Sequence, residues 1–245
     1  MHVPGIHRSI ELASGFMCGR FYLDTPREHL REQFALKQMP LLAGRFNIAP
    51  SQDIAAIREG EAGRELVMLH WGLIPHWAKE EKTKFSMINA RAETVATKPA
   101  YRSAFRQRRC LVPASGFIEW QPTDRGRQPY AVRLKDTELF AFAGLWEHWE
   151  GADGKTIESC TLIVTDANEL LQPIHDRMPV ILDPDDYDDW LGHEAVETEH
   201  LLSLLRPYPA TQMILYPVSQ RVNSPKNDDP WCVEPTLSNR SERTQ

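Results

Sequence analysis

Apolar residues along this chain fall mostly in short runs that alternate with polar positions or are rich in β-branched and aromatic side chains. Runs of this length and composition, bounded by turn-forming residues, are typical of β-strands. We predict strands within residues 53–59, 66–75, 110–120, 129–134, 139–149, 159–167, 178–182 and 212–219. Their number and spacing indicate a curved antiparallel sheet or a barrel-like core.

Helical patterns are fewer and shorter than the strand patterns. Residues 24–36 have Asp24 or Thr25 as the expected N-cap and a proline in the first turn. Residues 183–192 repeat the Asp-Pro opening, and residues 197–207 form a third candidate that ends at a proline. Strands therefore dominate, and the predicted fold class is α+β with a β-rich, barrel-like core and peripheral helices.

The length of 245 residues and an ordinary apolar fraction indicate one compact domain. We place this domain at residues 17–235, and we expect residues 1–16 to be a non-native extension or a leader and residues 236–245 to be a mobile tail. No apolar run approaches the roughly 18 residues of a membrane span, and no signal-peptide core precedes the domain. We therefore expect a soluble, cytoplasmic protein with no membrane contact, and we take it to be a monomer.

The four cysteines lie far apart in the sequence and form no C-x-x-C pair. This spacing suits neither a zinc ribbon nor a disulfide framework, and it favours a reducing compartment. None of the nine histidines shows the spacing of a metal site. We therefore expect neither a metal nor a cofactor.

The net charge of −6 averages two unlike regions. Residues 17–135 carry 20 basic and 12 acidic side chains, whereas residues 136–200 carry 2 basic and 17 acidic side chains. This difference suits one basic face that binds a polyanion and one acidic face that limits non-specific binding. Solvated charges on two unrelated faces explain the same numbers.

Glu119 ends an apolar run, between Ile118 and Trp120. A carboxylate in that position is poorly solvated unless another group holds it, so its pKa would rise and it could serve in acid/base chemistry. A glutamate that merely emerges at the end of a strand is the competing interpretation.

Three further polar residues stand in apolar or turn-like contexts. His175 lies in a turn before the strand predicted at 178–182, where an imidazole could transfer protons near neutral pH or could be merely structural. Asn89 and Arg91 alternate along a predicted strand and therefore share one face. An amide beside a guanidinium suits orientation of a polar group next to a phosphate, and it equally suits a surface hydrogen-bonding pair.

Three tryptophans could offer flat surfaces to unpaired bases, namely Trp71, Trp77 and Trp120. Stacking of a base on an aromatic ring is worth about 1–3 kcal/mol. Tryptophans are core residues by default, and we expect at least one of the three to be buried.

Eight segments stand in the order MCGRF, RFNIAP, WGLIPHW, INARAET, CLVPASGFIEW, FAGLW, LIVTDAN and IHDRMPVIL. In this order and spacing they make the chain, from Met17 to Asn227, resemble the SOS response-associated peptidase (SRAP) family of abasic-site-processing proteins. The resemblance implies a role in the DNA damage response, with single-stranded DNA that contains abasic sites as the partner. It also implies a covalent DNA–protein cross-link through an N-terminal cysteine that methionine removal exposes.

By this resemblance Met17 is the natural start, and its removal leaves Cys18 with a free α-amine and a thiol on adjacent carbons. The amine, with a pKa of roughly 7.7–8, would form an imine with the abasic aldehyde. The neighbouring thiol would then close a five-membered thiazolidine. An abasic-site lyase activity and a self-processing peptidase activity are also implied.

The resemblance assigns roles to the remaining candidate residues. Glu119 would handle protons at the amine and imine, His175 would assist sugar opening and reversal, and Asn89 would orient the cysteine or the sugar. The DNA contacts would be Arg20, Arg45, Arg91 and Arg177, with Asn47 and Thr165 as polar supplements and Pro50, Trp77 and Trp120 as apolar walls. Ala78 departs from the pattern, because some family members carry a second aromatic residue there.

Two other functions compete with this assignment. One is a cysteine hydrolase in which Cys18 attacks a carbonyl carbon, with His175 as its base and Asn89 or Glu119 as the orienting group. The other is a non-catalytic module that binds single-stranded DNA and tolerates the loss of Cys18.

Overall fold

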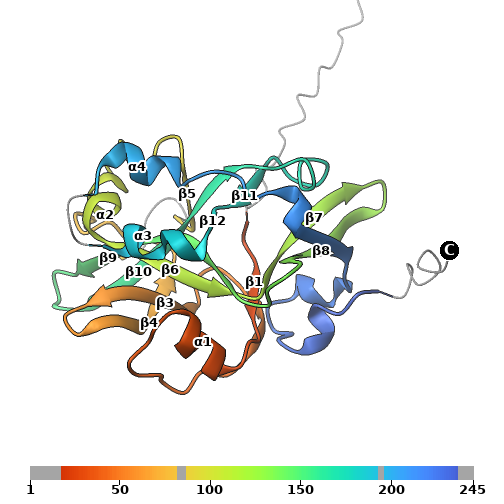
Figure 1. Ribbon diagram of the computed structural model, residues 1–245, viewed down its shortest axis with the longest axis horizontal. Coiled ribbons are helices and arrows are strands. Elements are labelled where there is room, and N and C mark those ends of the chain that lie inside the picture. The colour runs from red at the N-terminus through yellow and green to blue at the C-terminus, as the bar shows by residue number, and fades with distance from the viewer. Residues whose placement is uncertain (1–17, 82–86, 193–195, 237–245) are drawn as a thin grey trace, which may run out of the picture.

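The computed structural model describes residues 18–81, 87–192 and 196–236, and its strands form two sheets (Figure 1). The smaller sheet is antiparallel, in the order β13 (Met213–Pro217), β8 (Gly126–Leu134), β7 (Gly116–Thr123), β1 (Phe21–Leu23) and β2 (Arg45–Ile48). The larger sheet has the order β11 (Arg177–Pro179), β10 (Thr156–Asp166), β4 (Gly63–Trp71), β3 (Asp53–Gly60), β6 (Arg109–Ala114), β9 (Phe140–Glu150) and β12 (Ile181–Leu182), with β5 (Asn89–Arg91) beside β10.

The larger sheet closes on itself. Strand β10 pairs with β4 on one side and with β9 on the other, and β4, β3, β6 and β9 pair in turn, which completes a ring. The predicted α+β class with a barrel-like core is confirmed. The pairings of β10 with β4 and β5 are parallel, and these depart from the expected antiparallel pattern.

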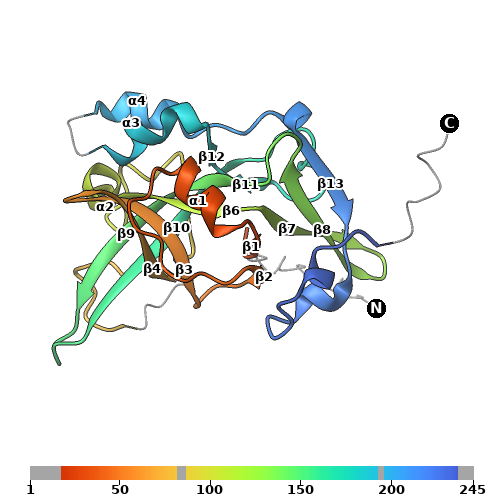
Figure 2. The ribbon, with the colours of Figure 1, turned by 60° about the horizontal axis from the view of Figure 1, so that its bottom comes forward.

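Four short α-helices lie around the strands (Figures 1 and 2), namely α1 (Arg27–Gln33), α2 (Arg102–Gln107), α3 (Tyr187–Leu191) and α4 (Thr198–Ser203). Helix α2 was not predicted. The expected side-chain cap of α1 is wrong, because Pro26 occupies the N-cap and the Thr25 hydroxyl instead bonds Ser115 Oγ at 2.8 Å. In the described part of the chain, no helix is long and apolar enough to cross a membrane.

Side chains of β1 and β7 alternate between two apolar cores, as successive residues of a strand must. Phe21 and Phe117 face the main core, where the Phe21 ring lies 5.3 Å from the Trp71 ring, centroid to centroid. Their neighbours Tyr22 and Ile118 face a smaller cluster on the other side of the sheet. The smaller sheet is therefore buried on both faces at this point.

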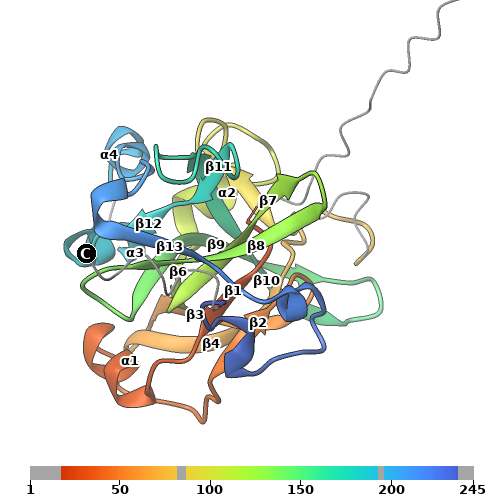
Figure 3. The ribbon, with the colours of Figure 1, turned by 90° about the vertical axis from the view of Figure 1, so that its right-hand side faces the viewer.

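Residues 218–236, here called the C-terminal segment, cover the smaller cluster. The segment contains two 3₁₀-helices, η3 (Gln220–Asn223) and η4 (Pro230–Cys232), and lies beside β8 and β2 (Figure 3). Its buried side chains in the cluster are Val218, Val222, Cys232 and Val233. The expectations for residues 1–16 and for the tail beyond 236 concern positions outside the described residues.

Candidate functional site

Cys18 and Glu119 meet at the junction of β1 and β7. The Ile118 N–H donates to the Arg20 carbonyl oxygen at 2.9 Å, which aligns the start of β1 with the middle of β7. Glu119 follows Phe117 by two residues and so faces the same side, where it is only 2% exposed. Cys18 is equally buried and has φ +42°, a left-handed conformation that is uncommon outside glycine.

The Glu119 carboxyl lies in an environment that favours its neutral form. Burial raises the pKa of Glu119 to about 8, although the Cys18 thiol and the backbone N–H groups of Cys18 and Trp120 donate hydrogen bonds that favour the carboxylate. Its Oε1 atom is buried and has no hydrogen-bond partner among the described residues. Near neutral pH this group therefore holds a proton that it can donate to a bound molecule.

The Cys18 thiol is also held in its neutral form. Burial raises the pKa of the thiol well above its usual range, and the nearby Glu119 and Asp176 carboxyls raise it further. The sulfur lies 3.7 Å from the backbone oxygen of Arg177. A cysteine that acts as a thiolate nucleophile needs the opposite environment, with a lowered pKa and positive charge nearby.

His175 bonds to its sequence neighbours. The Arg177 N–H donates to His175 Nδ1 at 3.0 Å, so the neutral ring carries its proton on Nε2. Asp176 Oδ1 lies 3.1 Å from the same Nδ1 atom. In the part of the chain that the structure describes, the side-chain polar contacts of His175 go to these two residues rather than to Cys18.

Strands β5, β10 and β11 bring four of the predicted residues to neighbouring positions. Asn89 lies opposite Leu162, Arg91 opposite Val164, Thr165 opposite Met178 and Arg177 opposite Asp166. The Arg177 guanidinium bonds Asp166 at 3.2 Å and also pairs with Glu93. Arg91 is exposed and Thr165 is buried. These strands border the cysteine through the Arg177 backbone contact.

Arg20 and Asn47 form a second group with the C-terminal segment. Arg20 Nη1 donates to Asn47 Oδ1 and to the Val222 carbonyl oxygen, both at 2.6 Å, and its guanidinium lies 5.5 Å from the centre of the Trp120 ring. Trp120 Nε1 donates to Asn223 Oδ1 at 2.7 Å. Asn47 is 0% exposed, so it supports Arg20 from behind rather than facing solvent.

The Asn47 side-chain amide donates its hydrogen bonds to the C-terminal segment. Nδ2 lies within 2.6–3.2 Å of the carbonyl oxygens of Val222, Ser224 and Asn227. The Asn47 N–H donates to Asp228 at 3.0 Å, and Arg45 Nε bonds the same carboxylate at 3.1 Å.

Of the three tryptophans, Trp71 belongs to the main core, which confirms that at least one is structural. Trp77 is 56% exposed on the loop between β4 and β5. That loop is anchored by His76 Nδ1, which lies 3.0 Å from the buried Glu147 carboxylate, and by Trp149 Nε1, which donates to the Ala78 oxygen. Pro50, next to β2, is partly exposed.

The sequence did not point to several residues that shape this site, namely Glu93, Glu147, Asp166, Asn223 and Asp228. Four of them lie at a strand end or outside the strands, where no periodic pattern marks them, and Glu147 lies inside β9. Their partners lie far away in the sequence, as with Asp228 and the Asn47 N–H, 181 positions apart. Only the folded chain brings them together.

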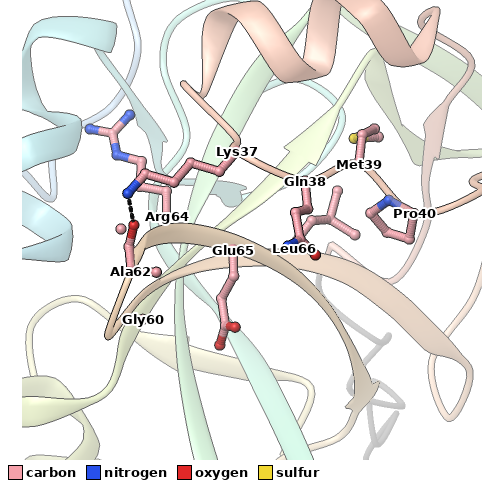
Figure 4. A pocket seen from close by; sticks show the side chains of 10 residues that line it. Lys37, Gln38, Met39, Pro40, Gly60, Ala62, Arg64, Glu65 and Leu66 are labelled. Atoms are coloured by element: carbon pink, nitrogen blue, oxygen red, sulfur yellow. Dashed lines mark hydrogen bonds between the residues drawn. The ribbon is translucent and has the colours of Figure 1, made fainter.

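A separate cavity of about 440 Å³ lies between the β3–β4 hairpin and the loop after α1 (Figure 4). Its lining includes Lys37, which bonds the Ala62 oxygen, and Arg64. None of the predicted site residues lines it. No group of three or more His, Cys, Asp or Glu side chains within the described ranges could hold a metal ion.

Comparison with known proteins identifies a family and several relatives. Residues 17–225 match the family described as SOS response associated peptidase (SRAP). The chain is 45% identical over 223 residues to the abasic site processing protein YoqW of Bacillus subtilis (strain 168), which covers 89% of this chain and 99% of the relative. It is 33% identical over 220 residues to the abasic site processing protein HMCES of Gallus gallus, which covers 80% of this chain and 63% of that protein.

The fold has a counterpart among solved structures. A crystal structure of a protein from Bacteroides thetaiotaomicron matches with a TM-score of 0.82 at 26% identity, covering 90% of this chain and 100% of the other. Family match, relatives and fold agree over most of the chain. The protein therefore belongs to the SOS response associated peptidase family.

Proposed function

We propose that this protein handles abasic sites in single-stranded DNA and joins to them covalently through Cys18 once the Met17–Cys18 bond has been cleaved. The names of the relatives support abasic-site processing as the general activity. The observation that carries the covalent step is the burial of Glu119 against both reactive ends of Cys18, the thiol and the backbone nitrogen. Cleavage turns that nitrogen into a primary amine while leaving it beside the carboxyl.

The reaction balances without an added oxidant or reductant. The α-amine attacks the C1′ aldehyde of the ring-opened sugar, and the resulting carbinolamine loses water to give an imine. The thiol then adds to the imine carbon, its proton passes to the nitrogen, and a five-membered thiazolidine results. Both nucleophiles belong to one residue, so the second addition is intramolecular and strongly favoured over capture of a free thiol.

Glu119 is suited to both proton transfers. In the uncleaved chain burial raises the pKa of Glu119 to about 8, near the roughly 7.7–8 of an α-amine. The amine released by cleavage favours the carboxylate, which can then accept the proton of that amine. As an acid it protonates the departing hydroxyl of the carbinolamine, and as a base it frees the amine. The neutral thiol needs no thiolate stage before it reacts with a protonated imine held at the same residue.

The strained backbone at Cys18 also favours cleavage before it. A left-handed φ at a non-glycine residue costs on the order of 1 kcal/mol or more. This angle is defined only while a peptide bond precedes the residue. Cleavage of the Met17–Cys18 bond removes the constraint on φ, so the cleaved chain keeps the Cys18 position without that cost.

The remaining candidates take supporting roles in this proposal. His175 carries a proton on Nε2, which suits assistance of sugar opening and of reversal. Asn89 orients the cysteine or sugar. Arg20, Arg91 and Arg177 contact phosphates, and Trp77 and Trp120 stack on bases. Arg45, Pro50, Asn47 and Thr165 complete the interface, with Asn47 and Thr165 acting from buried positions.

A cysteine hydrolase is disfavoured by two features of the site. The thiol is held neutral, and the side-chain polar contacts of His175 in the described chain go to Asp176 and Arg177. A thiolate–imidazolium pair would require a thiol with a lowered pKa and a His175 ring in contact with Cys18.

The test compares three proteins on an abasic single-stranded oligonucleotide, using denaturing gels and intact-mass spectrometry. A chain that begins at Cys18 should form a cross-link that survives without reductant. A Cys18→Ser chain with the same start should form only a link that borohydride traps. A chain that keeps one residue before Cys18 should form neither, because its amine is an amide. Equal cross-linking by this last chain would refute the proposed mechanism.

A further inference from the structure

The C-terminal segment presents an exposed tryptophan that has no role in the proposed site. Trp231, in η4, is 63% exposed. The Arg221 guanidinium, from η3, lies 5.9 Å from the centre of the Trp231 ring. Asp229 accepts hydrogen bonds from Arg221 Nε and Nη2 at distances of 2.6–3.2 Å, so the guanidinium is fixed beside the ring. Exposed tryptophans with a fixed cation beside them are features of binding surfaces.

This pair is attached directly to the proposed DNA contacts. The residues that follow Arg221, Val222 and Asn223, bond the side chains of Arg20 and Trp120. Helix η4 contacts both η3 and β2, the strand that contains Asn47, and Figure 3 shows the segment beside β2. Trp231 therefore belongs to the same segment that holds the side chains of Arg20 and Trp120.

Three acidic side chains stand near Trp231 in the sequence: Glu234 is exposed, and the two aspartates are paired. The Asp228 carboxylate accepts hydrogen bonds from Arg45 and from the N–H groups of Phe46 and Asn47. The Asp229 carboxylate forms an ion pair with Arg221. Lys226, in the same segment, is exposed. The surface thus offers an aromatic face with cations beside it, which is how proteins hold unpaired bases without reading their sequence.

We propose that Trp231 and Arg221 form a stacking platform for an unpaired base of the bound strand, outside the abasic nucleotide. The platform adds length to the DNA interface and therefore selects longer single-stranded regions over short ones. This inference rests on the proposed function, since it assumes that a DNA strand occupies the surface formed by Arg20 and Trp120.

The test measures the affinity of the chain that begins at Cys18 for undamaged single strands by fluorescence anisotropy. Two probe lengths are used, about 5 and about 15 nucleotides, which bracket the range of single-strand sites. Trp231→Ala should weaken binding of the long strand by about 5- to 150-fold, the equivalent of losing one stacked base, and should change binding of the short strand little. Trp231→Tyr, which keeps a ring, should restore most of the loss.

Two further variants control the interpretation. Leu202→Ala removes an exposed apolar side chain on α4 and should leave both affinities unchanged. Arg221→Ala should weaken binding of the long strand as Trp231→Ala does. Circular dichroism and thermal unfolding establish that each variant is folded, as expected for a surface position.

The outcomes separate the inference from the proposed function. If the wild type binds and cross-links but Trp231→Ala binds both strands equally well, the platform does not exist while the proposed function stands. If Trp231→Ala instead changes the mass in solution, the ring is a protein contact and the inference is wrong. If the wild type binds neither strand, the proposed function fails and the inference fails with it.

Discussion

At the scale of single residues, the main result is that Glu119 and Cys18 set each other's protonation. Burial keeps both groups neutral. The Glu119 carboxyl further opposes ionisation of the Cys18 thiol, whereas the hydrogen bonds that Cys18 donates favour the Glu119 carboxylate. Cleavage before Cys18 would add a positive amine beside the carboxyl. That charge favours the carboxylate, so the pKa of Glu119 should fall when the chain begins at Cys18.

The first prediction concerns the pH dependence of stability in the chain that keeps residues before Cys18. An unfolded glutamate has a pKa of about 4.3, whereas the folded value is about 8, so between these limits only the folded protein holds the proton. The free energy of unfolding should therefore fall as the pH rises from about 4.3 to 8, by an amount on the order of a few kcal/mol. Denaturant unfolding at a series of pH values measures it.

Glu119→Gln is the matched variant for this experiment, because it keeps the shape and removes the titration. Its stability should change much less over the same pH range. If the free energy of unfolding changed equally with pH in both proteins, Glu119 would not carry the shifted proton. For a chain that begins at Cys18, the change in unfolding free energy over this pH range should lie between those of the two proteins, since its amine stabilises the carboxylate.

The second prediction concerns reaction rate. Glu119→Gln, in the chain that begins at Cys18, should slow cross-link formation by about 10²–10⁴-fold, the usual contribution of general acid–base catalysis. Affinity for undamaged single strands should stay the same, because Glu119 is buried and contacts no phosphate in this proposal. A variant that loses affinity and rate in equal measure would indicate a binding role instead.

At the scale of elements, the C-terminal segment is part of the site rather than an appendage. Its backbone oxygens hold Arg20 and Asn47, and its valines and Cys232 fill the smaller core against Tyr22 and Ile118. The segment contains little regular structure, yet its polar groups are paired with β2. The position of the guanidinium over Trp120 depends on this packing.

The third prediction separates this structural role from DNA contact. Asn47→Ala removes the donors to Val222, Ser224 and Asn227 and leaves Arg20 without its amide acceptor, so stability should fall by about 2–4 kcal/mol. Arg91→Ala is the control, because that side chain is exposed, and its stability should stay within about 0.5 kcal/mol of the wild type. Unfolding in denaturant measures both. If Asn47→Ala were as stable as Arg91→Ala, the C-terminal segment would not depend on this amide.

At the scale of the whole molecule, the two charge regions seen in the sequence are interleaved, because β9 and β10 of the acidic region pair with β4, β5 and β6 of the basic region. Helix α3, which carries Asp188 and Asp189, lies on the side opposite the C-terminal segment in Figures 1 and 2. Many of the basic groups near the site are already paired, as Arg45 is with Asp228 and Arg177 with Asp166 and Glu93. Binding of DNA must exchange these pairs for phosphates, so the number of basic side chains in residues 17–135 overstates the attraction to DNA.

The fourth prediction follows from this pairing. The affinity for single-stranded DNA should fall as salt rises, and Arg91→Ala should reduce the slope of log K against log salt by about 0.7, the value for one phosphate contact. Arg45→Ala should reduce it less, because Asp228 already neutralises that guanidinium at 3.1 Å. Titrations at several salt concentrations measure the slopes. Equal slopes for wild type and Arg91→Ala would remove Arg91 from the phosphate contacts.

The sequence by itself determined most of the strands and the fold class, because alternation of apolar residues reports locally which face of a strand is buried. It did not mark the short strands β1 and β2, and it placed β6 and β7 in a single run. The family followed from the order and spacing of eight segments. For Glu119 the sequence left two interpretations, a buried acid and an emerging strand end, and the fold decides for burial, because Glu119 follows Phe117 by two residues and faces the main core. The contact of Cys18 with Arg177, 159 positions away, was decided only by the tertiary structure. The tertiary structure alone also decided the hydrogen bonds of Asn47 with the C-terminal segment and the position of Trp231 beside Arg221. Side-chain pairing across distant segments depends on how the sheets close and not on any local period.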